Sequence, residues 1–290
     1  MYFAFSEGEK TVCIVQVLLK KIPLIGTLSR INRGPLILDD VSSLEEDNIL
    51  LRSIETIIQE CKKRKWRMLQ IAPEIKCEEE TQKSLMALGF KKQTSLPWSS
   101  GLLSLKPEEE EILMALNGKW RNCLRKGIKL GVKVCLASNS KANLKKVIEI
   151  YKNLQKEKNF KGLSEPLIRS LFQQSHQSWK FNIFTAHASG KNGLKKDLGT
   201  LVSVSSGNTS IYLVGATPVE GRKFQSNYVL LWQAILEAKN RGCEWFDIGG
   251  LDESSHKGIA HFKKGLQAKP YSLIGEWRIF FVPKLFKLFF

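Results

Sequence analysis

The sequence predicts an α+β fold divided into two domains. Its 290 residues correspond to about two domains of ~150 residues each. Hydrophobic residues make up 43% and charged residues 25%, which is typical of a globular chain and excludes a disordered or collagen-like one. Segments with helical spacing of apolar residues alternate with short strand-like runs. We therefore expect mixed sheets with flanking helices, in a first domain over residues 1–106 and a second over residues 107–290.

The first domain is expected to begin with strand-like sequence and to contain two helices. The first helix has Ser42 before its apolar stripe, as a helix N-terminus favours, and the second ends at Gly89, a residue suited to a C-cap. The elements expected are, in order, a strand at Val12–Leu19, a loop through Pro23, Gly26 and Gly34, a helix at Ser42–Lys63, a strand at Arg67–Ile71, a helix at Glu79–Leu88 and a strand at Leu102–Leu105.

The second domain is expected to open with a long helix that bridges the two. Pro107 and the acidic run Glu108–Glu111 suit a first helical turn, and an apolar face continues to a stop at Gly131. Residues 206–209, Ser-Gly-Asn-Thr, suit a tight hairpin turn. The other elements expected are strands at Val132–Leu136, Phe181–Ala186, Gly199–Ser205, Ser210–Gly215 and Trp245–Ile248, helices at Asn143–Lys156, Glu165–Gln174 and Ser226–Arg241, and extended pieces at Phe262, Tyr271–Gly275 and Trp277–Val282.

Basic residues outnumber acidic ones and are unevenly placed. Lys and Arg number 45 against 28 Asp and Glu, which gives a formal net charge of +17. Three windows contain no acid at all: Lys10–Leu38, Ile112–Ile148 and Ser254–Gly275. Such windows indicate one or more regions that bind nucleic acid, phosphorylated substrates or an anionic membrane surface, although a generally basic proteome would give a similar surplus.

Three cations of the bridging helix are expected on one helical face. Arg121, Arg125 and Lys129 are spaced i, i+4 and i+8, and like charges at this spacing repel by about a few tenths of a kcal/mol per pair. We interpret them as a surface for phosphates or RNA. The alternative is a solvated basic face whose side-chain stems cover apolar surface.

The cysteines and the N-terminus are typical of a cytoplasmic protein. The six cysteines are scattered and form no C-x-x-C pair, which indicates reduced thiols. No apolar run approaches the ~18 residues needed to span a bilayer. Met1–Lys10 lacks the basic start and apolar core of a signal peptide. We expect a cytoplasmic protein that is a monomer.

Four segments in the C-terminal half carry a family pattern. They are Ile211–Pro218, Ser226–Ile235, Arg241–Gly250, which ends in Asp-Ile-Gly-Gly, and Gly258–Lys263. In order and spacing they closely resemble the Fem-type (FemABX) aminoacyltransferases, which build peptidoglycan interpeptide bridges and are a branch of the GNAT-like acyltransferases. The resemblance implies two GNAT-like domains with a cleft between them.

Matches further upstream extend the resemblance to about Arg33–Arg278. Arg33-Gly-Pro35 is similar to the family's R-G-P, and Leu85–Phe90 to its short helix ending in G-F. Lys119–Val132 is similar to its K-x-R-x-x-I-R-K-x-x-x-x-G-V. Because only about thirty residues precede Arg33, an opening helix and strand of the family are expected to be missing, and the first GNAT-like domain to be abbreviated.

The resemblance implies a tRNA-dependent reaction. In the family an amine of a peptidoglycan-precursor stem peptide attacks the ester of an aminoacyl-tRNA, and the F-K motif that matches Phe262-Lys263 is catalytic. A fixed ammonium can stabilise both the oxyanion and the departing 3′-oxygen. The structural alternative for Lys263 is a surface lysine beside Lys264. The family tends to continue x-x-F-G, whereas Leu266-Gln267 follows here, a departure that bears on specificity and activity.

The resemblance also implies residues that hold the precursor. Arg33 belongs to the R-G-P match, and Tyr212 matches an aromatic position that contacts the precursor, although a strand tyrosine can equally pack in the sheet. Lys158 stands where relatives use an arginine for the precursor's phosphates, and a lysine lacks the bidentate fork. Asp247 can bind a substrate amine or, as its position before Gly-Gly favours, cap the turn.

The sequence contains no recognisable cofactor or metal motif. The four histidines, His176, His187, His256 and His261, lack ligand-like spacing with cysteine or carboxylate. A P-loop and a dinucleotide fingerprint are absent. The [QR]-x-x-G-x-[GA] loop that cradles the pyrophosphate of CoA is absent as well, which argues against acyl-CoA. We expect neither a cofactor nor a metal.

The C-terminal sequence mixes aromatic residues with lysines. Within Trp277–Phe290, Lys284 and Lys287 alternate with phenylalanines and leucines. This pattern is typical of a segment that rests on the inner face of an anionic membrane, and equally of a last strand with a tail packed on the core.

The sequence therefore predicts an aminoacyltransferase that moves an amino acid from aminoacyl-tRNA to the stem peptide of a UDP-linked or lipid-linked muropeptide. Two alternatives remain. One is a GNAT-type N-acyltransferase for another amine, on a polysaccharide, lipid or protein. The other is a non-catalytic basic module that binds RNA or membrane.

Overall fold

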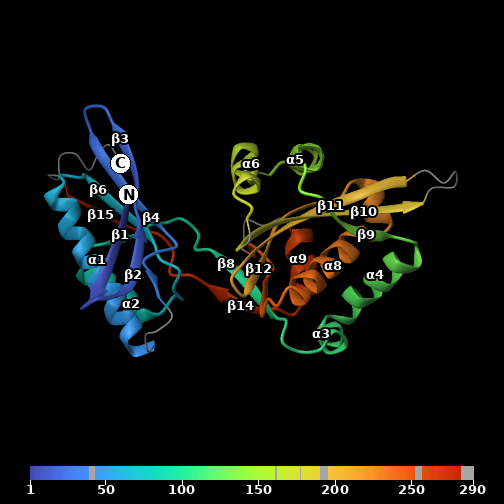
Figure 1. Cartoon of the computed structure of the whole chain (residues 1–290), viewed down its shortest axis with the longest axis horizontal. Coiled ribbons are helices and arrows are strands. Elements are labelled where there is room, and N and C mark those ends of the chain that lie inside the picture. The colour runs from blue at the N-terminus through green and yellow to red at the C-terminus, as the bar shows by residue number, and fades with distance from the viewer. Residues whose placement is uncertain (39–42, 161, 177, 190–194, 252–256, 282–290) are drawn as a thin grey trace. The chain divides into compact units, whose positions relative to one another are not determined.

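The chain forms two compact units that both combine sheets with helices. A computed structural model describes residues 1–38, 43–160, 162–176, 178–189, 195–251 and 257–281. One unit consists of Met1–Ser99 and the segment from Tyr271 onward, and the other consists of Ser100–Pro270 (Figure 1). The predicted α+β class is confirmed.

The first unit holds two sheets and helices α1 and α2 in its described part. Its elements are β1 (Tyr2–Glu7), β2 (Lys10–Gln16), β3 (Leu18–Ile22), β4 (Gly26–Asn32), β5 (Leu36–Ile37), α1 (Ser43–Lys63), β6 (Met68–Ala72), α2 (Glu79–Ala87), β7 (Lys91–Lys92) and β15 (Trp277–Phe280). The sheets have the orders β1-β2-β5 and β3-β4-β6-β15-β7. Helix α1 packs on β2, β5 and β6, because Leu50, Ile54 and Ile57 recur on one helical face and are all buried.

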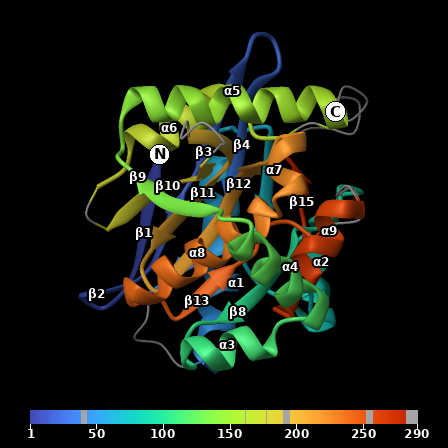
Figure 2. The same cartoon turned by 90° about the vertical axis from the view of Figure 1, so that its right-hand side faces the viewer.

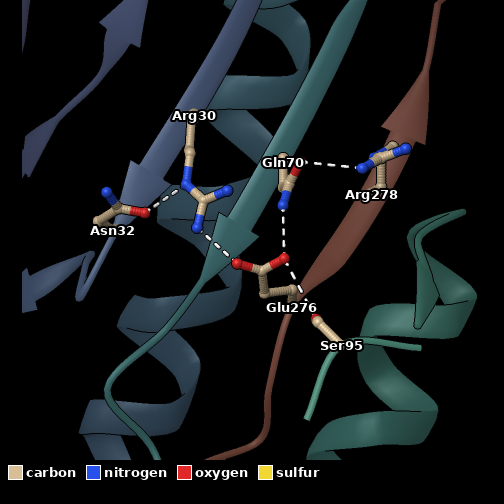
Figure 3. Close-up of polar contacts among 6 residues, drawn as sticks. All are labelled: Arg30, Asn32, Gln70, Ser95, Glu276 and Arg278. Atoms are coloured by element: carbon tan, nitrogen blue, oxygen red, sulfur yellow. Dashed lines mark hydrogen bonds and ion pairs between the residues drawn. The ribbon is translucent and has the colours of Figure 1, made fainter. Parts of the chain in front are cut away.

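The C-terminal strand β15 is tied into this unit by pairing and by a polar cluster. It pairs antiparallel with both β6 and β7. Just before it, the Glu276 carboxylate accepts hydrogen bonds from Arg30 (2.5 Å), Gln70 (2.8 Å) and Ser95 (3.2 Å) (Figure 3). Arg278 donates to the side-chain oxygen of Gln70 (3.2 Å). The cluster joins the returning chain to β4 and β6.

The two units differ from the domains predicted at residues 1–106 and 107–290. Strand β8 (Ser99–Ser104), expected at the end of the first domain, pairs with β13 (Trp245–Asp247) of the second unit. The segment from Tyr271 onward, expected in the second domain, groups with the first unit because β15 fills a place in its sheet. Long-range strand pairing of this kind leaves no local mark in the sequence.

The second unit is built on a seven-stranded sheet, whose strands β8 and β14 (Lys269–Ser272) run across the boundaries of the unit at Ser99 and Tyr271. Its remaining elements are α3 (Glu109–Ala115), α4 (Gly118–Lys129), β9 (Lys133–Ala137), α5 (Lys141–Lys158), α6 (Glu165–Gln173), β10 (Trp179–Ser189), β11 (Lys195–Ser206), β12 (Thr209–Ala216), α7 (Val219–Lys223), α8 (Ser226–Asn240), α9 (Lys257–Lys264) and β14 (Lys269–Ser272). The strand order is β14-β8-β13-β12-β11-β10-β9.

Helices cover both faces of this sheet. Neighbouring residues of a strand point to opposite faces, and Ile183 joins a core cluster with α5 and α6, whereas Phe184 joins another with α8. Figures 1 and 2 show α5 and α6 on one side of the sheet and α8 on the other. The middle of β10 is therefore buried on both faces, which explains the apolar Phe181, Ile183 and Phe184 in that strand.

Most helices match the sequence prediction, and the bridging helix is the main correction. A single helix over Pro107–Gly131 is wrong, because α3 ends at Ala115 and α4 begins at Gly118. Leu116 has an extended backbone, and the Asn117 side chain accepts a hydrogen bond from the Lys119 N–H (2.9 Å). Asparagine is a strong N-cap residue, so it starts a new helix where the apolar spacing alone suggested continuity.

Three further predictions are corrected. The strand predicted at Val12–Leu19 is divided between β2 and β3, and part of the loop predicted after it forms β4. Phe262 was expected in an extended piece but lies in α9, where Ile259 and Phe262 stand three residues apart on one helical face. The C-terminal segment for which membrane contact was predicted, Trp277–Phe290, falls mostly on residues 282–290, which lie outside the described residues, so this prediction is not tested. In the part of the chain that the structure describes, no helix is both long and apolar enough to span a bilayer.

Candidate active site

Lys263 is a buried lysine held in the second unit. Its side chain is only 6% exposed, whereas the neighbouring Lys264 is exposed, so the reading of Lys263 as a surface lysine is wrong. The ammonium donates a hydrogen bond to the Gly250 carbonyl oxygen (3.1 Å) and lies 4.8 Å from the centre of the Tyr212 ring. A buried ammonium is costly unless polar and π contacts stabilise it, and both are present here.

The turn after β13 brings the Gly250 carbonyl to this ammonium. Asp247 ends the strand, and its carboxylate accepts hydrogen bonds from the Gly249 N–H (2.8 Å) and the Ser100 hydroxyl. Gly249 has a φ of +71°, and a Cβ there would lie 2.7 Å from the Tyr212 carbonyl oxygen and 3.2 Å from the Lys263 Nζ. The turn therefore requires glycine, and the capping contact expected of Asp247 is present.

A pocket of about 310 Å³ is lined by three of the predicted residues, Lys158, Tyr212 and Phe262. Tyr212 connects it to Lys263, whose ammonium lies over the Tyr212 ring. Burial raises the pKa of the Tyr212 phenol above its usual range, and the neighbouring Tyr151 adds to the shift. Tyr212 is therefore a neutral hydrogen-bonding group at neutral pH. The other lining residues are Leu154, Gly215, Thr217, Arg222, Asn227, Gly258 and Ile259.

Two cations of this pocket share one carboxylate. Glu157 pairs with the Lys158 ammonium (3.1 Å) and the Arg222 guanidinium (2.7 Å), and both contacts hold the pKa of Glu157 below its usual range. Arg222 also donates to the Thr217 carbonyl oxygen (2.8 Å). The pocket thus offers two cations against one acid, a suitable environment for a phosphate group.

Sequence analysis missed Arg222. It lies in α7, a five-residue helix that was not predicted. The local signal was present, since Pro218 precedes the helix, Glu220 lies in its first turn and basic residues close it. Arg222 supplies this pocket with a guanidinium, which can bind a phosphate through two N–H groups, as the Lys158 ammonium cannot.

Phe262 belongs to an aromatic cluster that borders a second, smaller pocket. Its ring stacks on Trp120 (6.2 Å between ring centres) and meets Tyr228 edge-on (5.0 Å). The second pocket, of about 120 Å³, is lined by Asn117, Lys119, Trp120, Tyr228, His261, Phe262, Lys264, Gly265 and Gln267.

The second pocket joins two of the acid-free windows. Lys119 and Trp120 come from the window at residues 112–148, and His261 and Lys264 from the window at 254–275. Trp120 is 3% exposed, and its indole N–H has no hydrogen-bond partner among the described residues. Burial raises the pKa of Tyr228 to about 12, and the nearby Cys123 adds to the shift. The pocket therefore presents donors and cations but no acid.

The remaining predicted residues are placed as follows. Arg121 is not a free cation of α4, because its guanidinium donates to the Leu116 carbonyl oxygen (3.0 Å) and to that of Met114, where α3 ends. Arg125 and Lys129 are exposed on the same helix. Arg33 belongs to the first unit, where it pairs with Glu74 (2.9 Å) and lies 5.3 Å from the centre of the Trp98 ring.

Within the described ranges, no group of three or more histidine, cysteine, aspartate or glutamate side chains is placed to hold a metal ion.

Comparison with known proteins identifies relatives. Residues 136–289 match the FemAB family model. A lipid II:glycine glycyltransferase of Staphylococcus aureus is 22% identical over a 353-residue alignment that covers 95% of this chain and 82% of the relative. The matched range contains Lys263 and every lining residue of the pocket that includes Tyr212 and Arg222.

Solved structures show the same fold. A crystal structure of FemX has a TM-score of 0.82 at 19% identity and covers 99% of this chain and 89% of its own. A tandem GNAT protein from the clavulanic acid biosynthesis pathway has a TM-score of 0.55 at 11% identity, with 98% and 83% covered. The predicted GNAT-like architecture is therefore confirmed.

Proposed function

This chain belongs to the FemAB family, and on that premise we propose that it transfers an amino acid from an aminoacyl-tRNA to the stem-peptide amine of a peptidoglycan precursor. The S. aureus relative is named for lipid II and glycine. A lipid-linked or UDP-linked muropeptide is accordingly the proposed acceptor. The observation that carries the proposal is the buried Lys263 ammonium, which lies against the ring of Tyr212, a residue that lines a pocket together with Lys158 and Arg222.

Lys263 is the proposed catalytic group. When the acceptor amine attacks the ester carbonyl, a C–N bond forms and the carbonyl oxygen becomes negative. The C–O bond to the tRNA then breaks, and the proton lost by the amine reaches the departing 3′-oxygen. An ammonium that Gly250 and Tyr212 already hold in place stabilises both negative oxygens without reorganising. No covalent intermediate on the protein is needed.

The pocket lined by Lys158, Tyr212 and Arg222 is the proposed acceptor site. Lys158 and Arg222 would hold phosphate oxygens of the precursor, and the neutral Tyr212 hydroxyl would donate to its peptide. Asp247 is proposed to act on the substrate only indirectly, because its carboxylate holds the Gly249 turn. Arg33 is proposed as a further precursor contact from the first unit.

The smaller pocket and α4 are the proposed donor site. Lys119 and Lys264 would bind phosphate oxygens near the 3′ end of the tRNA. Arg125 and Lys129 would extend this anion-binding surface along α4, and Arg121 would support it by fixing the end of α3. Phe262 lines both pockets, so it would separate the donor from the acceptor.

A cytoplasmic location is part of the proposal. All six cysteines are unpaired, and three of them are buried (Cys13, Cys61 and Cys243). Free thiols fit a reducing compartment, which is also where aminoacyl-tRNA is found.

The test is a comparison of donors. Purified protein is mixed with a labelled aminoacyl-tRNA pool or with labelled acyl-CoA, and each mixture is offered UDP-linked and lipid-linked muropeptides. We expect label to move from tRNA to a muropeptide. Transfer from acyl-CoA alone would replace the proposal with a GNAT-type N-acyltransferase. Binding of tRNA without transfer from either donor would favour a non-catalytic RNA-binding module.

A further inference from the structure

The turn between β3 and β4 carries apolar side chains into solvent. Leu24 at its tip is 105% exposed relative to the reference residue, and Leu18 and Leu19 in β3 are 46% and 40% exposed. Leu24 has a φ of +65°, a left-handed conformation that is unfavourable for a branched side chain. Figures 1 and 2 show this hairpin extending beyond the rest of its unit.

This composition is unusual for a hairpin turn. The tip reads Ile22-Pro-Leu-Ile25, in which Pro23 is an ordinary turn residue, but Leu24 occupies the positive-φ position where turns favour glycine or asparagine. Strand β3 is an edge strand of its sheet, and Lys20 and Lys21 protect that edge from pairing with another chain. An apolar tip with two lysines at its base suits the bilayer interface, because the tip can enter the apolar region while the lysines contact the anionic surface.

A further cation, Arg67, lies at the base of the tip. The Arg67 side chain packs on Gly26, where an added Cβ would lie 3.0 Å from the Arg67 Cγ. The backbone N–H of Arg67 donates to the Thr27 carbonyl oxygen (2.8 Å). The turn after α1 therefore lies beside the hairpin. We define the basic collar as a set of exposed cations that form no ion pair within the described part of the chain: Lys20, Lys21, Lys62, Lys65 and Arg67.

The hairpin itself contributes no opposing charge. It lies within the acid-free window Lys10–Leu38. Phe281, the last residue before the C-terminal sequence 282–290, is bound at the same end of the unit, because its N–H donates to the Arg67 carbonyl oxygen (3.0 Å).

We propose that the β3–β4 tip and the basic collar form a peripheral binding surface for an anionic phospholipid bilayer. Leu24 enters the headgroup region, and the collar contacts the lipid phosphates. An RNA backbone would satisfy the lysines but would leave the fully exposed Leu24 in water, so the observations favour lipid. The proposal does not depend on the transfer reaction, because binding to vesicles is measured without any substrate.

The test uses the full chain and two kinds of vesicle, phosphatidylcholine alone and phosphatidylcholine with phosphatidylglycerol. We expect sedimentation with the anionic vesicles only, and weaker sedimentation at high salt. Leu24→Glu should lower the partition coefficient between water and anionic vesicles by about tenfold or more, because it replaces the inserted apolar group with a negative charge that the anionic lipid repels. Met86→Glu is the matched control: Met86 is 55% exposed on α2, away from the tip in Figure 1, and should change partitioning less than about twofold.

A second variant reports insertion directly. Leu24→Trp should bind at least as well as the wild type, and its added fluorescence should shift to the blue and be quenched by brominated lipid. If the added indole fluorescence stayed unquenched in sedimented Leu24→Trp, or if Leu24→Glu bound like the wild type, the proposal would be overturned. It would also be overturned if Lys20→Gln/Lys21→Gln weakened binding of an RNA oligonucleotide but left vesicle binding unchanged.

Discussion

The Gly249→Ala variant tests whether the turn after β13 positions the Lys263 ammonium. The added Cβ would lie 2.7 Å from the Tyr212 carbonyl oxygen, a backbone atom of β12, and 3.2 Å from the Lys263 Nζ. The φ of +71° alone costs an alanine about 1–2 kcal/mol, and the close contacts add about 1–3 kcal/mol. Lys263 is the flexible partner, so we expect its ammonium to move.

A displacement of about 1 Å at a reacting centre lowers a rate by about a hundredfold. We therefore expect Gly249→Ala to reduce single-turnover transfer by about that factor while the protein stays folded. Gly242→Ala is the matched control, because Gly242 has a φ of +81° but nothing lies within 4 Å of the added Cβ. It should lose stability by the backbone cost alone and keep its transfer rate.

The assay measures both variants by thermal unfolding and by transfer at a temperature where each is folded. If Gly249→Ala transferred label as fast as Gly242→Ala, the Lys263 position would not depend on this turn and the reasoning would be refuted. A loss of rate in Gly242→Ala equal to that in Gly249→Ala would refute it too, because stability and not position would then explain the effect.

Three further predictions concern the acceptor pocket, the first unit and the tyrosines. Arg222→Ala should raise the KM for the muropeptide by about tenfold with little change in kcat, because it removes a cation that binds substrate and transition state alike. Glu276→Ala should lower the free energy of unfolding by about 1–3 kcal/mol, mainly because the buried Gln70 amide loses its acceptor. Tyr212 and Tyr228 have raised pKa values in the fold, so stability should be full below pH ~10 and should fall as pH rises from there toward their folded-state pKa values, with their phenolate absorbance appearing late.

Each of these has a contradicting outcome. Lys223→Ala, on the same helix but outside the pocket lining, is the control for Arg222, and an equal KM effect in both would remove the assigned contact. Urea unfolding of Glu276→Ala with an unchanged midpoint would show that the polar cluster does not stabilise the first unit. Titration at 295 nm in which all five tyrosines ionise near pH 10 would contradict the burial of the two rings.

Local signals in the sequence predicted the helices well. The stripe that predicts Ser42–Lys63 is the buried face of α1, and the glycine stops after α2, α4 and α8 all follow helix ends in the structure. The missed features depend on contacts between distant segments. Strand β15 pairs with β6 across about two hundred residues of chain, and nothing near Trp277 indicates that partner.

The candidate site was predictable only where a motif marked it. Lys263 and Tyr212 were singled out by resemblance, and the structure brings the ammonium onto the ring. Arg222 was missed because α7 is shorter than the window over which helical spacing can be recognised. Arg121 fitted a charge stripe, but it caps α3 because the helix breaks at Asn117, which apolar spacing did not predict.

The most direct test of the account is single-turnover transfer by Lys263→Ala, measured with labelled aminoacyl-tRNA and a muropeptide acceptor beside Lys264→Ala. The two residues are adjacent in α9, but Lys263 is buried against Tyr212 and Lys264 is exposed. Loss of one electrostatic donor to a developing oxyanion lowers a rate by about a hundred- to a thousandfold. We expect that loss in Lys263→Ala, with tRNA binding retained. Lys264→Ala should bind tRNA more weakly, because Lys264 is a proposed tRNA contact, but should keep a near wild-type rate when aminoacyl-tRNA is saturating. Transfer by Lys263→Ala at the wild-type rate would contradict the central claim.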